Sequence, residues 1–226
     1  ESVLEECHWS EASASGRLSF VIVHTNARND FRTPIPRDRA VCDDCLRDTF
    51  DASSRRHRYA FTSCTKCGPR FSIIRSMPYE RAETTMREFD LCERCAKEYR
   101  DPDDPRFHAQ TNACPDCGPK LWCSGQFGHT ISQSDAVIAH AAAEIHRGRI
   151  IALRGIGGYQ LICDATNAAA VQRLRVAKQR PDKPFAVMLS RSHAESIRVS
   201  LSTPAWAALR STANPIVIQG LSGVTL

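Results

Sequence analysis

The pattern of hydrophobic and polar residues divides the chain into three parts, and the first part is short of apolar surface. Residues 18–23 form a strand-like run, and the polar stretch behind it ends in Thr33-Pro34-Ile35-Pro36. Two prolines one residue apart disfavour a helix and favour an extended linker. A single strand cannot bury its apolar face alone. We therefore interpret residues 1–39 as the tail of a preceding domain plus a linker, or as a strand that docks on a neighbour.

The second part, residues 40–122, has too few apolar residues for its length to build an independent core. Its one local pattern is Thr84 to Phe89, which predicts a short helix or turn. Metal coordination would have to supply the folding free energy, which for structural zinc is on the order of 10 kcal/mol. We expect the metal-free protein to lose this module.

The third part begins after a glycine-rich stretch and alternates helical with strand-like patterns. Such alternation is typical of an α/β sheet with helices on its faces. The chain stops at Leu226 with no closing element, so we expect residues 130–226 to be an incomplete domain. The predicted elements are a helix over 134–145 that ends at Gly148, strands over 149–153 and 161–163, a helix that Thr166 caps, a strand over 185–189, a helix from Ser202 or Thr203 to Leu209, and a strand over 216–218.

Eight of the eleven cysteines form four Cys-x-x-Cys pairs, and the second half of the array repeats the first fifty positions later. Each half reads C-x2-C-x18-C-x2-C. Two such pairs complete a tetrahedral shell of thiolates around one zinc ion, and a shell of four cysteines leaves no position for a reacting water. We predict two structural zinc ions, with iron–sulfur ligation and a cross-braced arrangement as alternatives. The expected quartets are Cys42, Cys45, Cys64 and Cys67, then Cys92, Cys95, Cys114 and Cys117.

Cysteine usage also bears on the compartment. The cysteine count is odd and the N-terminal residues lack a charged-then-apolar signal pattern, so a reducing, cytoplasmic location is expected rather than a disulfide framework. No apolar run approaches the roughly 18 residues that span a bilayer. The sequence also lacks an initiator Met, which indicates a piece of a longer protein.

Charge separates the second part from the third. Residues 42–119 carry a net charge of −1, whereas residues 120–226 carry twelve basic and five acidic side chains, for +7. The third part is therefore the better candidate for holding anions. Lys178, Arg180 and Lys183 gather at a predicted helix end, where they form either a phosphate site or solvated charge. The turn at 155–158 is either a tight turn or a loop whose N–H groups approach a phosphate.

Together, these residues resemble the HypF-type carbamoyltransferases that mature [NiFe] hydrogenases. The complete cysteine spacing, with twenty-four residues between its halves, is that family's hallmark. The resemblance spans about residues 33–218. The matching phrases are Cys64-Thr65-Lys66-Cys67-Gly68-Pro69-Arg70-Phe71, Pro78-Tyr79-Glu80-Arg81, Thr84-Thr85-Met86, Arg106-Phe107-His108-Ala109-Gln110, Gly155-Ile156-Gly157-Gly158-Tyr159 with Cys163-Asp164-Ala165, and Arg180-Pro181-Asp182-Lys183-Pro184-Phe185-Ala186-Val187-Met188.

The resemblance implies a mixed α+β to α/β fold with three parts. Residues 1–39 would hold the end of an acylphosphatase-like domain and a linker. Residues 40–122 would form tandem zinc fingers, and residues 130–226 would begin a YrdC-like nucleotide-binding domain that is cut off before a Kae-like domain. By itself such a fragment is expected to be inactive.

The implied activity uses ATP and carbamoyl phosphate to form a carbamoyl adenylate, and then transfers the carbamoyl group to the C-terminal cysteine of a HypE-like acceptor. That group becomes a cyanide ligand of the hydrogenase iron. Phosphate or adenylate contacts would come from Lys178, Arg180 and Lys183, with Arg154 as a further candidate; no catalytic residue is assigned. The family usually has Lys at Arg154 and His at Gln160, and either change could impair chemistry.

Three alternatives stay open at this point. The basic third part, together with the double-stranded-RNA binding of YrdC-like proteins, allows a zinc-containing protein that binds double-stranded RNA. Related enzymes carbamoylate a hydroxyl of a small molecule instead of a protein. The zinc region could also be a structural module that docks neighbouring domains.

Overall fold

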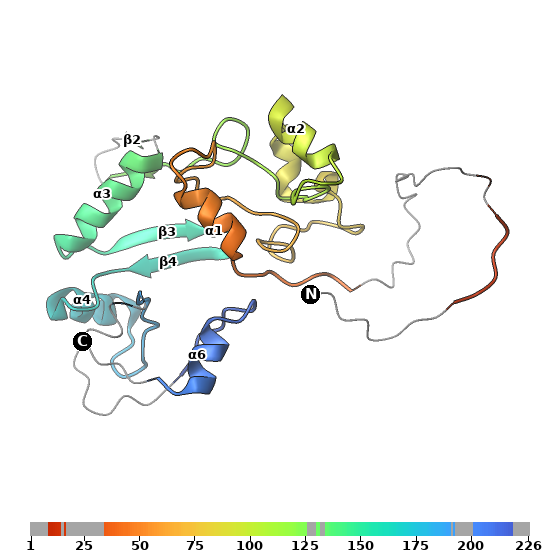
Figure 1. The fold of residues 1–226 in the computed structure, drawn as a ribbon. Coiled ribbons are helices and arrows are strands. Elements are labelled where there is room, and N and C mark those ends of the chain that lie inside the picture. The colour runs from red at the N-terminus through yellow and green to blue at the C-terminus, as the bar shows by residue number, and fades with distance from the viewer. Residues whose placement is uncertain are drawn as a thin grey trace. The chain divides into compact units, whose positions relative to one another are not determined.

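The computed structural model describes residues 9–14, 16, 34–125, 130–131, 134–190, 192 and 201–218. The chain divides into two compact units, residues 1–31 and residues 32–226. In the first unit, the few described residues form neither helix nor strand, and the strand predicted over 18–23 lies outside the described residues. All described helices and strands belong to the second unit (Figure 1).

Two matching helices open the two cysteine repeats, and the sequence analysis did not predict them. Helix α1 spans Asp43–Phe50 and helix α2 spans Glu93–Arg100. Each follows an extended cysteine at its N-cap, with acidic residues in its first turn and basic residues in its last, as the helix dipole favours. Each buries just one residue, the second cysteine of its pair. These helices therefore owe their place to the cysteine cluster and not to an apolar face, which is why a hydrophobic pattern misses them.

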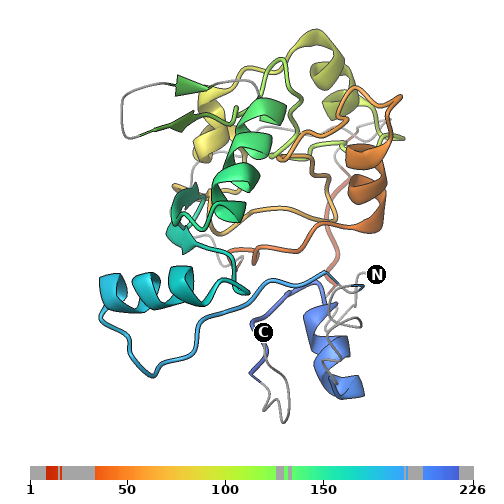
Figure 2. The same cartoon turned by 90° about the vertical axis from the view of Figure 1, so that its left-hand side faces the viewer.

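The duplication extends to the backbone of the loops that follow these helices. The N–H of Arg58 donates to the carbonyl of Thr49 at 2.7 Å, and fifty residues later the N–H of His108 donates to that of Tyr99 at 3.0 Å. Arg58 and His108 share the left-handed conformation, with φ of 58° and 52°. Helices α1 and α2 lie apart from each other in two perpendicular views (Figures 1 and 2).

A small apolar core lies between the two repeats. Its buried members are Tyr59, Ile73, Met86 and Ala113. The segment that connects the repeats contains two 3-10 helices, Arg81–Glu83 and Thr85–Glu88, and the second confirms the short helix predicted there. Since the core takes residues from both repeats and from their connection, the three pieces pack as one body.

The repeated glycine after each second cysteine pair has a packing reason. At Gly118 a Cβ would meet the Cβ of Ala113 at 2.5 Å and the hydroxyl of Tyr59 at 2.2 Å. At Gly68, whose φ is +92°, it would meet the Cβ of Ser63 at 2.8 Å. No residue with a Cβ fits either position without displacing its neighbours.

The C-terminal part alternates helices with strands, largely as predicted. Strands β3 and β4 pair antiparallel as a hairpin, with Ile151 opposite Ile162 and Gly155 opposite Gly158 (Figure 1). The short strands β1 and β2 also pair antiparallel. The elements are β1 (Cys123–Ser124), β2 (Thr130–Ile131), α3 (Ser134–His146), β3 (Ile151–Gly155), β4 (Gly158–Ile162), α4 (Ala168–Lys178) and α6 (Thr203–Leu209).

Three local predictions in this part were wrong. Residues 185–189 and 216–218 form neither helix nor strand and pair with no other described segment. Their apolar composition satisfied the strand pattern, but a strand also needs a neighbour to accept its hydrogen bonds. The N-cap of α4 is Asn167, whose side chain accepts from the N–H of Ala170 at 3.0 Å, while Thr166 bonds to Asp164 instead. Within the described residues, no helix has the length and apolarity needed to cross a bilayer.

Candidate metal centres and anion-binding segment

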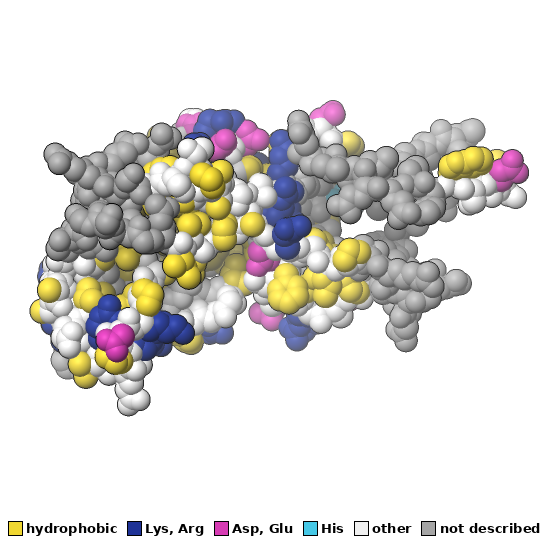
Figure 3. All heavy atoms as spheres, turned by 90° about the horizontal axis from the view of Figure 1, so that it is seen from below, with side chains coloured by type: hydrophobic (Ala, Val, Ile, Leu, Met, Phe, Trp, Pro, Cys, Tyr) yellow, Lys and Arg dark blue, Asp and Glu magenta, His cyan; other side chains and the backbone are white. Residues whose placement is uncertain are grey.

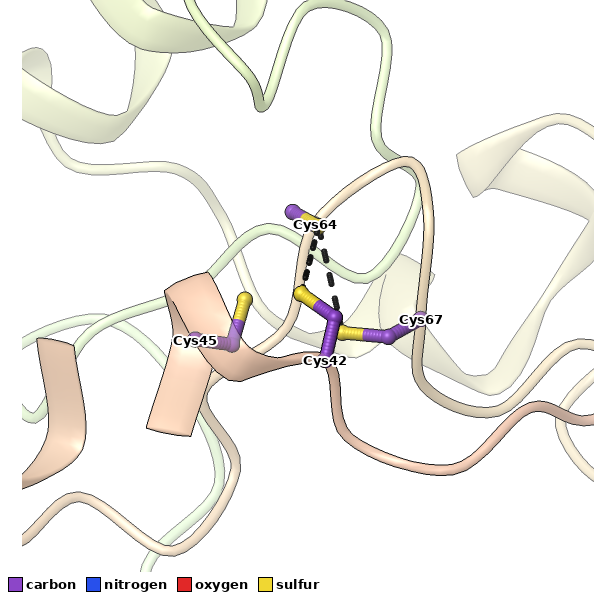
Figure 4. A group of neighbouring side chains, drawn as sticks. All are labelled: Cys42, Cys45, Cys64 and Cys67. Carbon is purple, nitrogen blue, oxygen red and sulfur yellow. Dashed lines mark hydrogen bonds between the residues drawn. The ribbon is translucent and has the colours of Figure 1, made fainter. Parts of the chain in front are cut away.

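The first four-cysteine cluster is assembled from the start of α1 and a turn nineteen to twenty-five residues downstream. Cys42 lies at the N-cap position of α1 and Cys45 in its first turn, while Cys64 and Cys67 come from the later turn (Figure 4). The sulfur of Cys64 lies 3.7 Å from that of Cys42 and 3.8 Å from that of Cys67. All four sulfurs lie within 4.8 Å of one another.

The second cluster repeats this arrangement around α2. Its sulfur–sulfur distances are 3.8 Å from Cys92 to Cys114, 3.8 Å from Cys114 to Cys117 and 3.6 Å from Cys117 to Cys95. The two clusters follow the order of the repeats, so the grouping is sequential and not cross-braced.

These distances can be compared with what a zinc ion requires. A Zn–S bond of about 2.3 Å and tetrahedral angles place neighbouring sulfurs about 3.8 Å apart, whereas a disulfide holds its sulfurs at about 2.0 Å. The five distances given above lie close to the first value, and the ten described cysteines are free thiols. The donor set therefore fits a tetrahedral thiophilic ion in each cluster.

The close approach of the sulfurs also gives the thiols of one cluster different pKa values. Hydrogen bonds with Cys45 and Cys64 lower the pKa of Cys67 to about 3, while hydrogen bonds with Cys64 and Cys67 raise the pKa of Cys45. Protons are thus shared unevenly within the cluster, and at least one thiolate is present at neutral pH to begin metal binding.

Reciprocal ion pairs connect the two repeats. Arg56, which is 2% exposed, pairs with Glu98 on α2 at 2.6 Å. Fifty residues later, Arg106 pairs with Asp48 on α1. Although burial alone would raise the pKa of Glu98, hydrogen bonds from Arg56 and Arg55 hold it at about 2. Each repeat therefore contributes an arginine that pairs with a carboxylate on the helix of the other repeat.

The predicted anion-binding residues fall into two groups. Lys178 ends α4, and Arg180 and Lys183 follow it in the next few residues. Arg154 lies on β3 with its guanidinium 5.9 Å from the ring centre of Tyr159, and no hydrogen bond or ion pair joins it to the other three within the described residues. The structure thus brings together the first three along one turn and leaves Arg154 on the hairpin.

Arg175 organises this turn, and the sequence analysis missed it. Its Nη1 donates to the carbonyls of Arg180, Pro181 and Lys183, each at 3.1 Å. The guanidiniums of Arg175 and Arg180 both lie over the ring of Phe185, at 4.9 and 5.4 Å. A basic residue in the last turn of a helix is usual, and no local pattern signals three carbonyls folding back onto it.

The Nε atom of Arg180 is buried and has no hydrogen-bond partner among the described residues. Its Nη2 makes one long bond, 3.4 Å, to the carbonyl of Pro184. Among the described residues, the Nε–H donor of this guanidinium is therefore unused. On the face of the molecule drawn in Figure 3, hydrophobic side chains and Lys or Arg side chains lie next to each other.

The β3–β4 hairpin carries exposed apolar residues. Leu153, Tyr159 and Leu161 are 44%, 73% and 40% exposed. An isolated two-stranded sheet is marginally stable in water. The hairpin therefore exposes apolar side chains of the kind that a sheet usually buries against other elements.

Comparisons with known proteins match both halves of the second unit. A family model described as "HypF finger" matches residues 41–74 and 91–123. A second, for the Sua5/YciO/YrdC family and described as "Telomere recombination", matches residues 143–218. Carbamoyltransferase HypF of Rhodobacter capsulatus is 51% identical over 191 residues, which is 84% of this chain and 25% of the relative. The probable carbamoyltransferase HypF of Methanocaldococcus jannaschii is 44% identical over 199 residues, 88% of this chain and 26% of the relative.

Two solved structures are similar as well. The crystal structure of T. kodakarensis HypF superposes with a TM-score of 0.76 at 42% identity, over 82% of this chain and 24% of that one. A crystal structure of full-length HypF in the phosphate- and nucleotide-bound form superposes with a TM-score of 0.70 at 43% identity, over 79% of this chain and 23% of that one. The chain spans about a quarter of the length of these proteins. The predicted fold class, two four-cysteine finger units followed by part of a YrdC-like α/β domain, is confirmed.

Proposed function

Because the chain belongs to the HypF family of carbamoyltransferases, we propose that it is the segment of such an enzyme that joins tandem zinc fingers to the start of a nucleotide-binding domain. The proposed boundaries are residues 1–39 for the preceding tail and linker, 40–122 for the fingers and 130–226 for the incomplete nucleotide-binding domain. The observation that carries the proposal is the pair of four-cysteine clusters inside the two matches to the HypF finger.

We propose that the two clusters hold one zinc ion each, through Cys42, Cys45, Cys64 and Cys67 and through Cys92, Cys95, Cys114 and Cys117. When bound, each ion supplies folding free energy rather than reaction chemistry, because four thiolates saturate it. Purified protein is expected to contain two zinc ions per chain by elemental analysis. A metal content near zero, or iron in place of zinc, would contradict this assignment.

We propose that the C-terminal part contributes to binding ATP through Lys178, Arg180 and Lys183, with Arg154 as a further contact. The net charge of +7 over residues 120–226 supports this, as does the unused donor capacity of Arg180. A similar structure is described as phosphate- and nucleotide-bound. Lys acts on phosphate as a point charge and Arg as a two-pronged donor, so the turn offers both modes.

Titration calorimetry with ATP tests this assignment on the purified chain. Weak binding is expected, and Arg180→Met should lower the affinity about tenfold, or about 1.4 kcal/mol, as the loss of one charge-assisted bond does. Arg147→Met is the matched control, since it removes the same charge from an exposed residue that pairs with Glu144. No binding at millimolar ATP, or equal losses in both variants, would refute a specific site.

The complete enzyme is proposed to use ATP and carbamoyl phosphate and to carbamoylate a HypE-like acceptor protein in the cytoplasm. Support comes from the relatives, which are named carbamoyltransferases. No observation on the described residues favours double-stranded RNA or a small-molecule hydroxyl as the partner. The acceptor cannot be tested on this segment, so the test is carbamoyl transfer by the full-length protein of which it forms part.

A further inference from the structure

A loop of the first finger reaches the metal cluster of the second. Arg55 and Arg56 lie between the two cysteine pairs of the first repeat, yet their guanidiniums contact Cys95, a member of the second cluster. Nη1 and Nη2 of Arg55 lie 3.4 and 3.3 Å from the sulfur of Cys95, and Nη2 of Arg56 lies 3.7 Å from it. One sulfur of the second cluster therefore accepts hydrogen bonds from two cations of the other finger.

Both guanidiniums are held in place by further partners. Glu98 pairs with Arg55 and with Arg56, each at 2.6 Å. Arg56 also donates to the carbonyl of Ala113 and to the side-chain oxygen of Asn112, each at 2.9 Å. Asn112 is fully buried and Arg56 is 2% exposed. These contacts fix the arginines against the sulfur. Because Asn112 and Arg56 are buried, bulk water has little access to the cluster on this side.

The first cluster has no equivalent arrangement. The positions fifty residues after Arg55 and Arg56 are Pro105 and Arg106. Proline carries no cation, and Arg106 pairs with Asp48 while its Nε is buried with no partner in the described part of the chain. Among the described residues, the donor to a sulfur of the first cluster from outside the cysteines is the backbone N–H of Lys66, 3.3 Å from Cys64. The two clusters are alike in their sulfurs and unlike in their surroundings.

We propose that Arg55 and Arg56 are outer-sphere positioning residues of the second metal site, so that the second cluster retains its metal more strongly than the first and does so through the first finger. The proposal rests on the zinc assignment proposed above. Four thiolates around a divalent ion carry a net charge of −2, and the guanidiniums that contact Cys95 offset part of that charge at the sulfur. Loss of such outer contacts elsewhere costs 10–100-fold in metal affinity.

The test follows metal release from the zinc-loaded chain under a chelator. Native mass spectrometry counts the ions, and alkylation followed by peptide mapping shows which cysteines have become free. In the wild type, the first cluster is expected to become alkylated well before the second. In Arg55→Met, release from the second cluster should accelerate about tenfold, while the first cluster keeps its rate. Arg55 is chosen because its side chain is 23% exposed, against 2% for Arg56.

Two controls separate the possible causes. Arg47→Met removes a cation of the same finger that pairs with Asp44 in solvent, and should leave both release rates unchanged. Arg55→Lys restores the charge and should recover part of the retention. Equal release rates of the two clusters in the wild type, no acceleration in Arg55→Met, or no recovery in Arg55→Lys would each overturn the proposal. Wild-type protein that contains no zinc would instead refute the zinc assignment itself.

Discussion

At the scale of single residues, buried charge decides how the fingers hold together. Glu98 accepts from Arg55, Arg56 and Asn112, so one carboxylate compensates two guanidiniums that are largely out of water. A buried ion that loses its partner still carries the free-energy cost of desolvation, but no longer has the electrostatic attraction that offset this cost. Arg81 uses a different solution, since its guanidinium donates to the carbonyls of Phe89, Gln110 and Asn112.

Replacing Glu98 with Gln should destabilise the zinc-loaded chain by about 3 kcal/mol, because two cations then lack their carboxylate. Urea unfolding at neutral pH measures the difference. Asp44→Asn is the control, because Asp44 and Arg47 pair in solvent, where such a pair contributes at most about 1 kcal/mol. A loss for Glu98→Gln no larger than this control would contradict the role assigned to Glu98.

The Glu98 carboxylate also predicts how the stability of the folded chain changes with pH. The pKa of Glu98 is about 2 in the folded chain against an ordinary value of 4.5, so its stabilisation is complete above 4.5 and fades as the pH falls toward 2. The stability difference between wild type and Glu98→Gln should therefore stay constant from neutral pH down to about 5. A difference that shrank already between pH 7 and 6 would point to another titrating group.

At the scale of elements, the fingers show what a sequence pattern can and cannot predict. Cysteine spacing predicted both quartets because ligand geometry constrains short separations. Helices α1 and α2 were missed, since each is eight residues long and buries one cysteine, which leaves no periodic signal. The contact from Arg55 to Cys95 spans forty residues, and spacing does not encode it. The capping of α6 by Ser202 was predictable because that signal is local.

Metal removal should melt these short helices selectively. Isolated helices shorter than about 12 residues are marginal in water, so α1 and α2 depend on the clusters, whereas α4 has its own N-cap and buried residues. Hydrogen exchange with mass spectrometry before and after chelation is the measurement. Amides of residues 43–50 and 93–100 should lose protection, and those of 168–178 should keep it. Protection that persists in all three segments would show that the fingers fold without metal.

At the scale of the whole molecule, the described elements of residues 32–226 divide into a cysteine-rich finger part and a basic part. The finger region is close to neutral in its side chains, whereas residues 120–226 carry +7. The β3–β4 hairpin exposes apolar residues, and the chain spans about a quarter of the length of its relatives. Within the finger region, the shared core around Met86 makes two metal sites one folding unit.

The Met86→Ala variant tests whether the two fingers form one folding unit. Met86 is 7% exposed and packs with Tyr59 of the first repeat and Ala113 of the second, so the cavity should cost about 3 kcal/mol. Cysteine alkylation during urea unfolding should show both clusters opening at the same, lowered urea concentration. Met188→Ala, at a position that is 97% exposed, should change neither. If one cluster opened well before the other in Met86→Ala, the two fingers would be independent units.

The reciprocal pairs Arg56–Glu98 and Arg106–Asp48 bear on the evolutionary origin of the duplicated finger. In each pair, a loop arginine of one copy meets a helix carboxylate of the other, which is the self-complementary pattern of a two-fold homodimer. A single ancestral finger that dimerised in this way would already have possessed both contacts. Fusion of two such copies into one chain would make the association intramolecular and release the two copies from identity. Pro105 opposite Arg55, and Asn112 opposite Thr62, are differences that a symmetric dimer could not have held.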